Sequence, residues 1–159
     1  MYMEHIVTEI FNKKLIIVSE GNSITGMDFD TQLKFKYYLR NSIENNQSEL
    51  LISAMDQLQE YAKGKRRVLD LKLEPKGTEF QKSVWNEVAK IPYGQTSSYL
   101  EIAKRISRPR AYRAVANAVG KNPITIIIPC HRIIRENGDL GGYSGGIDIK
   151  KLLLLREMS

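Results

Sequence analysis

The sequence predicts a mixed α/β protein in which a small N-terminal α/β domain (residues 1–75) is followed by a mostly helical C-terminal domain (residues 76–159). Three observations indicate this division. Strand-like and helix-like patterns alternate in the first part, helix-start signals repeat in the second, and positive charge gathers in the second. A chain of 159 residues is long enough for one ordinary domain or two small ones.

The first half begins with a predicted β-hairpin. KLIIVSEG (14–21) and SITGMDF (23–29) are rich in β-branched and apolar residues and meet at a Gly-Asn turn. The spacing of apolar residues then predicts helices over 31–43 and 49–64, the second ending at Gly64.

A further strand and a boundary are predicted at the end of this half. RVLDLKLE (67–74) alternates apolar and polar residues as a strand does. PKGT (75–78) combines proline and glycine, which mark a break between elements. No cluster of catalytic residue types is visible in the first 75 residues, so we expect a scaffold domain there.

A capping box marks the first helix of the second half. Thr78 and Gln81 have the residue types and spacing of this motif. The helix is expected to stop near IPYGQ (91–95), where proline and glycine cluster. Its apolar residues recur at helical spacing: Phe80, Val84, Trp85 and Val88.

Two shorter helices follow and form a candidate helix-turn-helix. Ser98 and Glu101 make a second capping-box pattern, which opens a helix over 98–106. Another helix is predicted over 110–122, with Pro109 suited to its first position. Two short helices joined by a tight turn are the arrangement of that motif.

The helix predicted over 110–122 has two distinct faces. Residues expected to form a core stripe are Ala111, Ala114, Val115, Ala118 and Val119. Residues on the polar face are Arg110, Arg113, Asn117 and Lys121. The alanines are explained by packing, whereas small residues beside basic ones allow the backbone to approach a DNA groove closely. The polar face is therefore a candidate DNA-reading surface.

The net charge of +6 is concentrated in the second half. Residues 1–75 carry 10 Lys and Arg against 11 Asp and Glu, a net charge of −1. Residues 76–159 carry 14 against 7, a net charge of +7. This asymmetry favours an anionic partner, most simply nucleic acid, although a basic face that contacts only solvent is the alternative.

Cys130, the single cysteine, lies in ITIIIPCHRII (124–134). ITIII predicts a buried strand that ends at Pro129, because proline cannot continue the hydrogen bonding of a central strand. Free cysteine commonly behaves as a small buried apolar residue, and His131 can equally be a hydrogen-bonded core histidine. Alternatively, a turn at Pro129 brings His131 near the Cys130 thiol. A histidine that is bonded to a carboxylate can take the thiol proton there and so raise the fraction of thiolate.

A set of motifs extends over residues 77–157. It runs from GTEFQKSVWNEVAKIPYGQTSSYLEIA through RPRAYRAVANAVGKNP and NPITIIIPCHRII to GDLGGYSGGIDIKKLLLLRE. These motifs resemble the signature of the O6-alkylguanine-DNA alkyltransferases, the methylated-DNA–protein-cysteine methyltransferases. The N-terminal half matches this family only in general layout. The resemblance implies a ribonuclease-H-like N-terminal domain and a winged-helix-like C-terminal domain.

The resemblance implies a reaction centred on Cys130, whose thiol accepts an alkyl group from guanine O6 irreversibly and once per molecule. His131 is implied to act on the thiol through a water, and Glu157 to orient His131. Tyr99 is implied to press on the phosphate of the target nucleotide and to supply a proton to the departing guanine. Asn122 is the implied hinge between the recognition helix and the active-site strand.

The resemblance also implies how the lesion is reached. A base inside a duplex hides its O6 substituent, so the nucleotide is flipped out, and Arg113 is implied to fill the gap. In GGYSGG, Tyr143 is implied to pack the base and Ser144 to contact its O6 edge. Tyr112 departs from the family, in which small residues are common there, and its ring either alters groove contact or covers the core edge. The expected DNA contacts are Tyr99, Arg110, Arg113, Ala114 and Asn117.

We expect a cytoplasmic monomer that acts on double-stranded DNA containing O6-alkylguanine, without a cofactor and without a membrane. One cysteine and two histidines form no recognisable metal-ligand cluster, and no phosphate-cradling motif is visible. No apolar run approaches a membrane span, no signal peptide is evident, and a lone cysteine suits a reducing compartment.

Three rival classes explain part of the pattern. A DNA-binding regulator accounts for the helix-turn-helix and the charge but has no use for Cys130, His131 and Glu157 together. A non-catalytic lesion sensor of similar fold lacks the acceptor cysteine. A thiol hydrolase gives no reason for a basic recognition helix.

Overall fold

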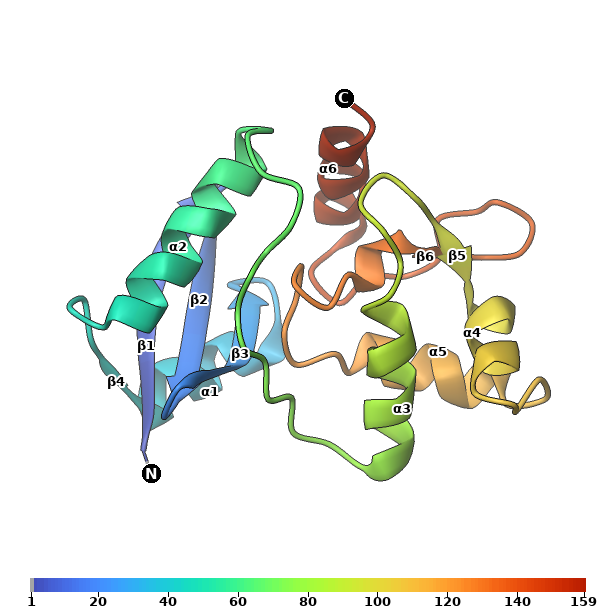
Figure 1. Ribbon diagram of the computed structural model, residues 1–159, viewed down its shortest axis with the longest axis horizontal. Helices are drawn as coiled ribbons and strands as arrows, with labels where there is room; N and C mark the ends of the chain where they lie inside the picture. Colours follow the sequence, from blue (N-terminus) through green and yellow to red (C-terminus); the bar gives the residue numbers. More distant parts are fainter. Residues whose placement is uncertain (1) are drawn as a thin grey trace. The chain divides into compact units, whose positions relative to one another are not determined.

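The structure is a computed structural model that describes residues 2–159, so residue 1 of the predicted N-terminal domain lies outside it. The described chain divides into two compact units, one ending at Pro75 and the other spanning Lys76–Met158. Figure 1 shows helices and strands in the mixed α/β combination that the sequence predicts. Within residues 2–159, no helix is both long and apolar enough to cross a membrane.

The first unit is a four-stranded sheet with two helices. Its elements are β1 (Met3–Ile10), β2 (Lys13–Glu20), β3 (Ser23–Phe29), α1 (Leu33–Asn41), β4 (Ser42–Glu44) and α2 (Glu49–Ala62). The strand order is β3-β2-β1-β4, with β4 parallel to β1 and the other pairs antiparallel. Five consecutive β2 residues, 15–19, are buried, and because side chains alternate along a strand, both faces of the sheet are covered. Ile16 and Val18 pack against Phe35 and Tyr38 of α1.

The predicted hairpin and the second helix of this unit are confirmed. β2 and β3 meet at Gly21, whose φ of +56° is one that glycine adopts without strain. Helix α2 begins after Ser48, whose side chain accepts a hydrogen bond from the Leu51 N–H at 3.2 Å. It ends before Gly64, which has a φ of +77°.

Two predictions in this unit are wrong in part. The helix predicted over 31–43 stops at Asn41, because the next three residues pair with β1 as the edge strand β4. The segment 67–74 is not a strand, because it pairs with the sheet through a single isolated bridge, between Ile24 and Leu73. The Gln57 side chain takes the place of a neighbouring strand by bonding the N–H of Asp70 at 2.8 Å and its carbonyl at 3.2 Å.

The second unit is mostly helical. Its elements are α3 (Glu79–Val88), β5 (Ser97–Ser98), α4 (Tyr99–Arg105), α5 (Tyr112–Gly120), the 3-10 turn η1 (Cys130–Arg132), β6 (Ile133–Ile134) and α6 (Ile147–Glu157). Helices α3, α4 and α5 pack together, and the Trp85 indole ties α3 to α5 by donating to the Ala118 carbonyl at 2.7 Å. The short strands β5 and β6 pair in parallel.

The helix starts of this unit follow the predicted capping residues. Thr78 and Gln81 form a complete capping box at the start of α3. At the start of α4 the predicted capping box is half formed: the Ser98 hydroxyl accepts a hydrogen bond from the Glu101 N–H at 3.1 Å, while the Glu101 side chain pairs with Arg105 at 3.5 Å. Both helices therefore begin where a side-chain acceptor satisfies a backbone donor.

Helix α5 begins later than predicted. The Ala111 N–H donates to the Arg108 carbonyl at 2.9 Å, which closes a turn with Pro109 at its second position. The fixed φ of proline suits that position, so Pro109 shapes the turn and Arg110 lies outside the helix. Ala114, predicted in the core stripe, is exposed. The buried face is the narrower one of Val115, Ala118 and Val119.

The strand predicted over 124–128 is wrong, although the segment is largely buried. It folds into a tight turn in which the Ile128 N–H donates to the Ile124 carbonyl at 3.1 Å and Ile126 has a φ of +76°. Asn122 makes the turn possible. Its Oδ1 accepts from the Ile124 N–H at 2.9 Å and its Nδ2 donates to the Ile128 carbonyl at 2.8 Å, bonds that a neighbouring strand would otherwise supply.

Candidate active site

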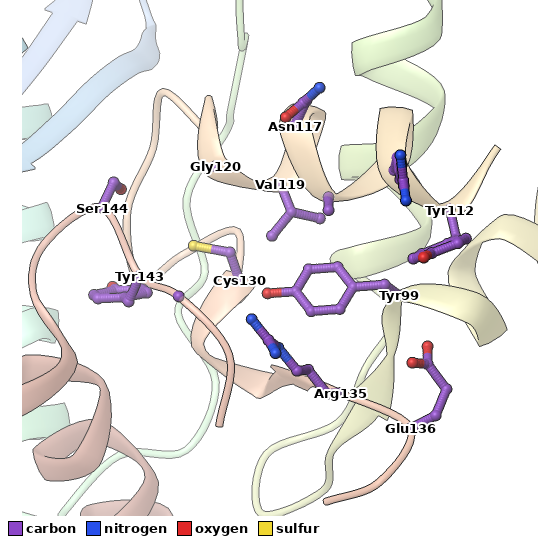
Figure 2. Close-up of a pocket in the computed structure, with 13 residues that line it drawn as sticks. Tyr99, Tyr112, Asn117, Val119, Gly120, Cys130, Arg135, Glu136, Tyr143 and Ser144 are labelled. Atoms are coloured by element: carbon purple, nitrogen blue, oxygen red, sulfur yellow. The ribbon is translucent and has the colours of Figure 1, made fainter. Parts of the chain in front are cut away.

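Cys130 lines a cavity of about 640 Å³ in the second unit (Figure 2). This volume lies within the range of about 300–1,000 Å³ that is usual for small-molecule sites. Six of the predicted site residues line the cavity: Tyr99, Arg113, Asn117, Cys130, Tyr143 and Ser144. They come from α4, α5, η1 and the glycine-rich loop before α6, so segments far apart in the sequence converge here.

The other predicted site residues lie outside the cavity lining. Asn122, His131 and Glu157 are buried, with their side chains linked to Cys130 or to each other. Arg110 and Ala114 are exposed and do not line the cavity. Cavity residues that the sequence interpretation did not single out as site residues are Tyr112, Ala116, Val119, Gly120, Arg135, Glu136 and Gly142.

Cys130 opens the η1 turn directly after Pro129. The Arg132 N–H donates to the Pro129 carbonyl at 2.9 Å, so the backbone turns here, as the proline predicts. Asn122 Nδ2 donates to the Cys130 sulfur at 3.0 Å. A hydrogen bond to the sulfur stabilises its charged form, so Asn122 both holds the adjoining turn and supports a thiolate.

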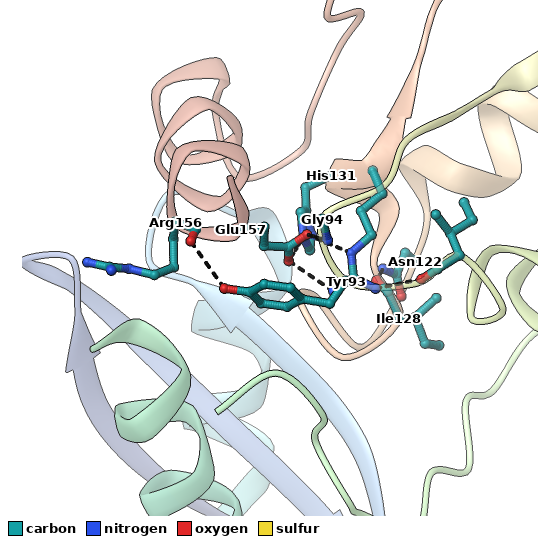
Figure 3. A network of polar contacts seen from close by, with 9 residues as sticks. Tyr93, Gly94, Asn122, Ile128, His131, Arg156 and Glu157 are labelled. Carbon is teal, nitrogen blue, oxygen red and sulfur yellow. Dashed lines mark hydrogen bonds and ion pairs between the residues drawn. The ribbon is translucent and has the colours of Figure 1, made fainter. Parts of the chain in front are cut away.

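His131 and Glu157 form a buried pair (Figure 3). His131 Nε2 lies 2.7 Å from Glu157 Oε2, and both side chains are almost completely enclosed. The Gly94 N–H donates to Glu157 Oε1 at 3.4 Å. Glu157 is the last residue of α6, so this helix brings the carboxylate to the η1 turn.

Burial lowers the pKa of His131. The hydrogen bond and the charge of Glu157 raise it, but the cations of Arg132 and Lys150 lower it further. The imidazole is therefore neutral at pH 7 and can accept a proton. Its Nδ1 has no hydrogen-bond partner within residues 2–159 and is the nitrogen available for that exchange.

Arg132 completes the group of buried charges and was not among the predicted site residues. Its Nε donates to Glu157 Oε1 at 2.8 Å and its Nη2 to Glu157 Oε2 at 2.9 Å, a bidentate pair. Its Nη1 donates to the Ile91 carbonyl at 2.6 Å, and its guanidinium lies 5.9 Å from the centre of the Tyr93 ring. An arginine within an isoleucine-rich run is a signal for such a partner, since a buried charge needs one.

Lys150 is a second buried cation missing from the prediction. It is 0% exposed, and its ammonium donates to the carbonyls of Ile133 (2.6 Å), Leu140 and Gly142 (3.2 Å). Burial lowers the pKa of Lys150 to about 8, and Cys130 partly offsets this. The three carbonyls belong to β6 and to the loop that follows it, so Lys150 fixes the loop to the strand beside Cys130. No pattern in the sequence distinguishes this lysine from its exposed neighbours.

Tyr99 points its hydroxyl toward Cys130 in Figure 2. Burial raises the pKa of Tyr99, Cys130 and Glu136 raise it as well, and Arg135 lowers it. The phenol therefore keeps its proton at neutral pH and can donate it within the cavity.

Metal ligation finds no support in the described part of the chain. Within residues 2–159, no three or more His, Cys, Asp or Glu side chains are grouped so that they could hold a metal ion. The chemistry that these residues can perform is attack by a sulfur nucleophile, with a neutral imidazole as base and a phenol as acid.

A family model described as "6-O-methylguanine DNA methyltransferase, DNA binding domain" matches residues 79–159. Among curated relatives, a Methanosarcina acetivorans protein named methylated-DNA–protein-cysteine methyltransferase is 53% identical over 117 residues, which cover 74% of each chain. A Haemophilus influenzae protein of the same name is 41% identical over 91% of this chain and 80% of its own. A Methanosarcina mazei protein of that name is 57% identical over 64% of this chain, and the match spans 65% of its length.

Solved structures resemble both units. The crystal structure of Mycobacterium tuberculosis O6-methylguanine methyltransferase superposes with a TM-score of 0.89 at 36% identity, covering 98% of this chain and 93% of that one. The Mycobacterium tuberculosis protein OGT in complex with DNA superposes with a TM-score of 0.87 at 37% identity, covering 99% and 93%.

Proposed function

The chain belongs to the 6-O-methylguanine DNA methyltransferase family, and on this basis we propose that it repairs DNA by moving the alkyl group of O6-alkylguanine onto Cys130. One observation carries the proposal. The single cysteine of the chain lines a cavity of about 640 Å³ together with Tyr99, Arg113 and Tyr143. A planar base fits such a cavity, and the thiol is the strongest nucleophile present.

The proposed reaction is one in-line displacement. The Cys130 sulfur attacks the alkyl carbon, a carbon–sulfur bond forms, and the bond from that carbon to guanine O6 breaks with its electron pair passing to the base. His131 takes the thiol proton through a water, and Glu157 orients His131. Their 2.7 Å contact and the neutral state of His131 support these roles.

Two further residues serve the ends of this reaction. Tyr99 supplies a proton to the departing guanine, which its raised pKa supports because the phenol remains protonated. Asn122 stabilises the thiolate through its 3.0 Å contact and is the hinge between α5 and the turn that carries Cys130. No cofactor is needed for this displacement, and the product is a thioether that this chain cannot cleave.

DNA binding is proposed for α5 and its surroundings. Arg113 is exposed at the cavity and fills the gap left by the flipped nucleotide, while Arg110, Ala114 and Asn117 contact the DNA around it. The net charge of +7 in residues 76–159 supports a nucleic-acid partner, which we propose is double-stranded DNA. Tyr143 packs the flipped base, and Ser144 contacts its O6 edge.

The finer fold assignment and the setting are also proposals. We infer a ribonuclease-H-like scaffold for residues 1–75 and a winged-helix-like arrangement around α4 and α5 for residues 76–159. The protein acts as a monomer. A free thiol at Cys130 must stay reduced to react, which suits the cytoplasm.

Arg113→Ala tests the DNA-repair step. The wild-type protein is expected to remove the methyl group from O6-methylguanine in a duplex and from the free base. The variant should react with the duplex about 10–100-fold more slowly, because flipping a nucleotide out of the base stack costs a few kcal/mol when no side chain fills the gap. Its rate on the free base should stay unchanged. Single-turnover rates on both substrates at saturating DNA measure this difference.

Arg110→Ala is the matched control, since it removes an arginine that lies outside the cavity. It is expected to weaken DNA affinity but to keep the rate at saturating duplex. Equal slowing of both substrates by Arg113→Ala would show that Arg113 does not fill the gap. A wild-type protein that leaves the duplex lesion intact would refute the proposed function itself.

A further inference from the structure

Arg135 is a cation at the cavity for which the proposed reaction has no role. It directly follows β6, and its side chain lines the cavity together with Cys130 and Tyr99. Figure 2 shows the guanidinium directed toward the hydroxyl end of Tyr99. Within residues 2–159 the guanidinium has no hydrogen bond or ion pair. An arginine at this position is therefore available to a ligand.

Backbone hydrogen bonds fix the main chain of Arg135, while its guanidinium is not held by them. The Arg135 N–H donates to the Asp139 carbonyl at 2.8 Å, and the Arg135 carbonyl accepts from the Gly138 N–H at 2.9 Å, so a tight turn anchors the residue. A Cβ at Gly141 would lie 3.0 Å from the Tyr99 hydroxyl and 3.7 Å from Arg135 Cγ. The two side chains thus converge beside Gly141.

The nearby carboxylates have partners elsewhere. Glu136 accepts a hydrogen bond from the Leu100 N–H at 2.7 Å, at the start of α4. Glu101 lies 3.5 Å from the guanidinium of Arg105, which it partly neutralises. The charge of Arg135 helps to lower the pKa of Glu136, but within residues 2–159 the guanidinium forms no direct ion pair with a carboxylate.

Arg135 also lines a second cavity, which is polar and open to solvent. It lines this cavity together with Thr96, Ser97 and Ser98, and Glu101 and Glu136 also line it. Hydroxyl groups and an unpaired guanidinium are the groups that proteins use to bind phosphodiesters. Arg135 therefore stands between a cavity suited to a base and a groove suited to a nucleic-acid backbone.

We propose that Arg135 binds the phosphodiester of the flipped nucleotide at the junction of these two cavities and so positions the O6 substituent at Cys130. This inference rests on the proposed function, because it assumes that the base enters the cavity while attached to a DNA strand. Arg135 differs in role from Arg113. Arg135 holds the backbone of the flipped nucleotide, so it is needed whether or not a complementary strand is present.

Three substrates separate these roles: O6-methylguanine as the free base, in a single-stranded oligonucleotide, and in a duplex. Arg135→Met is expected to lower the rate at subsaturating DNA about tenfold on both oligonucleotides, the effect of one charge-assisted hydrogen bond, and to leave the free base unchanged. Arg135→Lys should recover part of the loss, because lysine keeps the positive charge but lacks the paired N–H donors of the guanidinium. The dependence of log affinity for single strands on log salt should flatten by about 0.7 in Arg135→Met.

Lys82→Met is the control, since Lys82 is an exposed cation on α3 that lines neither cavity. It reports the effect of removing one charge from the same unit, and we expect a rate loss well below that of Arg135→Met. Slowing on the free base would overturn the inference by placing Arg135 in the thiol chemistry. Slowing on the duplex alone, or on neither oligonucleotide, would also overturn it. Absence of reaction by the wild-type protein on every substrate would instead refute the proposed function.

Discussion

Cys130→Ser is expected to abolish alkyl transfer while leaving the affinity for duplex DNA unchanged. Serine is nearly isosteric with cysteine, and its oxygen can accept the hydrogen bond that Asn122 Nδ2 makes to the sulfur at 3.0 Å. An alcohol stays protonated at neutral pH, so no nucleophile forms. The basic residues proposed to contact DNA lie on or next to α5 and are untouched. Transfer of a labelled methyl group and a DNA titration at fixed salt measure the two properties.

Measuring both transfer and binding shows whether Cys130 performs chemistry or holds the structure. Loss of both would show that the sulfur holds the fold or the DNA rather than performing chemistry. Full stoichiometric transfer by the variant would place the acceptor at another residue. Transfer by the wild-type protein that is lost in Cys130→Ser separates the account from a binding-only lesion sensor, in which neither protein would transfer the methyl group.

Glu157→Gln is expected to produce the largest loss of stability, about 3–5 kcal/mol in the free energy of unfolding. The carboxylate pairs with His131 at 2.7 Å and bidentately with Arg132 at 2.8 and 2.9 Å. The neutral amide leaves the largely enclosed Arg132 guanidinium without its counter-charge. Alkyl transfer should slow as well, because His131 loses the group that orients it. Denaturant unfolding and single-turnover rates measure both effects.

Glu87→Gln is the matched control for this change. Glu87 forms an ion pair with Lys90 at the same short distance, 2.8 Å, but this pair is far more exposed. Surface pairs contribute little, so its loss should stay within about 1 kcal/mol. Combining Glu157→Gln with Arg132→Met should recover part of the stability, since the unpaired charge is removed. Failure of this recovery would show that the carboxylate stabilises the fold by some other contact.

Helices and turns of the fold could be predicted where local chemistry decides them. Thr78, Ser98 and Gly64 mark helix ends through side-chain caps or a left-handed backbone, and each acts on its own neighbours in the chain. The β2–β3 hairpin depends on a local Gly-Asn turn in the same way.

Strand identity depended on partners that no local pattern reveals. ITIII reads as a buried strand, yet the Asn122 side chain meets its backbone bonds and the segment folds into a turn. RVLDLKLE alternates as a strand does but finds one bridge to the sheet. Strand β1 is not predicted at all, because Glu4, His5 and Glu9 interrupt its apolar pattern. Short apolar runs carry the same pattern in either state, and tertiary packing decides between them.

The candidate site shows the same division. The resemblance names Cys130, His131 and Glu157, and the structure brings His131 and Glu157 together across 26 residues of sequence. Arg132 and Lys150 were not anticipated, because their roles arise from contacts with α6, β6 and the loop between them. The isoleucine-rich run around Arg132 was a signal for a buried partner, whereas Lys150 becomes recognisable only when its burial is known, since lysine is common on surfaces.

Mass spectrometry tests the central claim most directly. The protein is incubated with a molar excess of duplex DNA containing O6-methylguanine, and the intact protein and its Cys130 peptide are weighed. We expect one methyl group per protein molecule, carried by the Cys130 peptide, with repair ending when the protein is consumed. Lesion loss without a methylated Cys130 peptide, or repair of more lesions than there are protein molecules, would contradict the account.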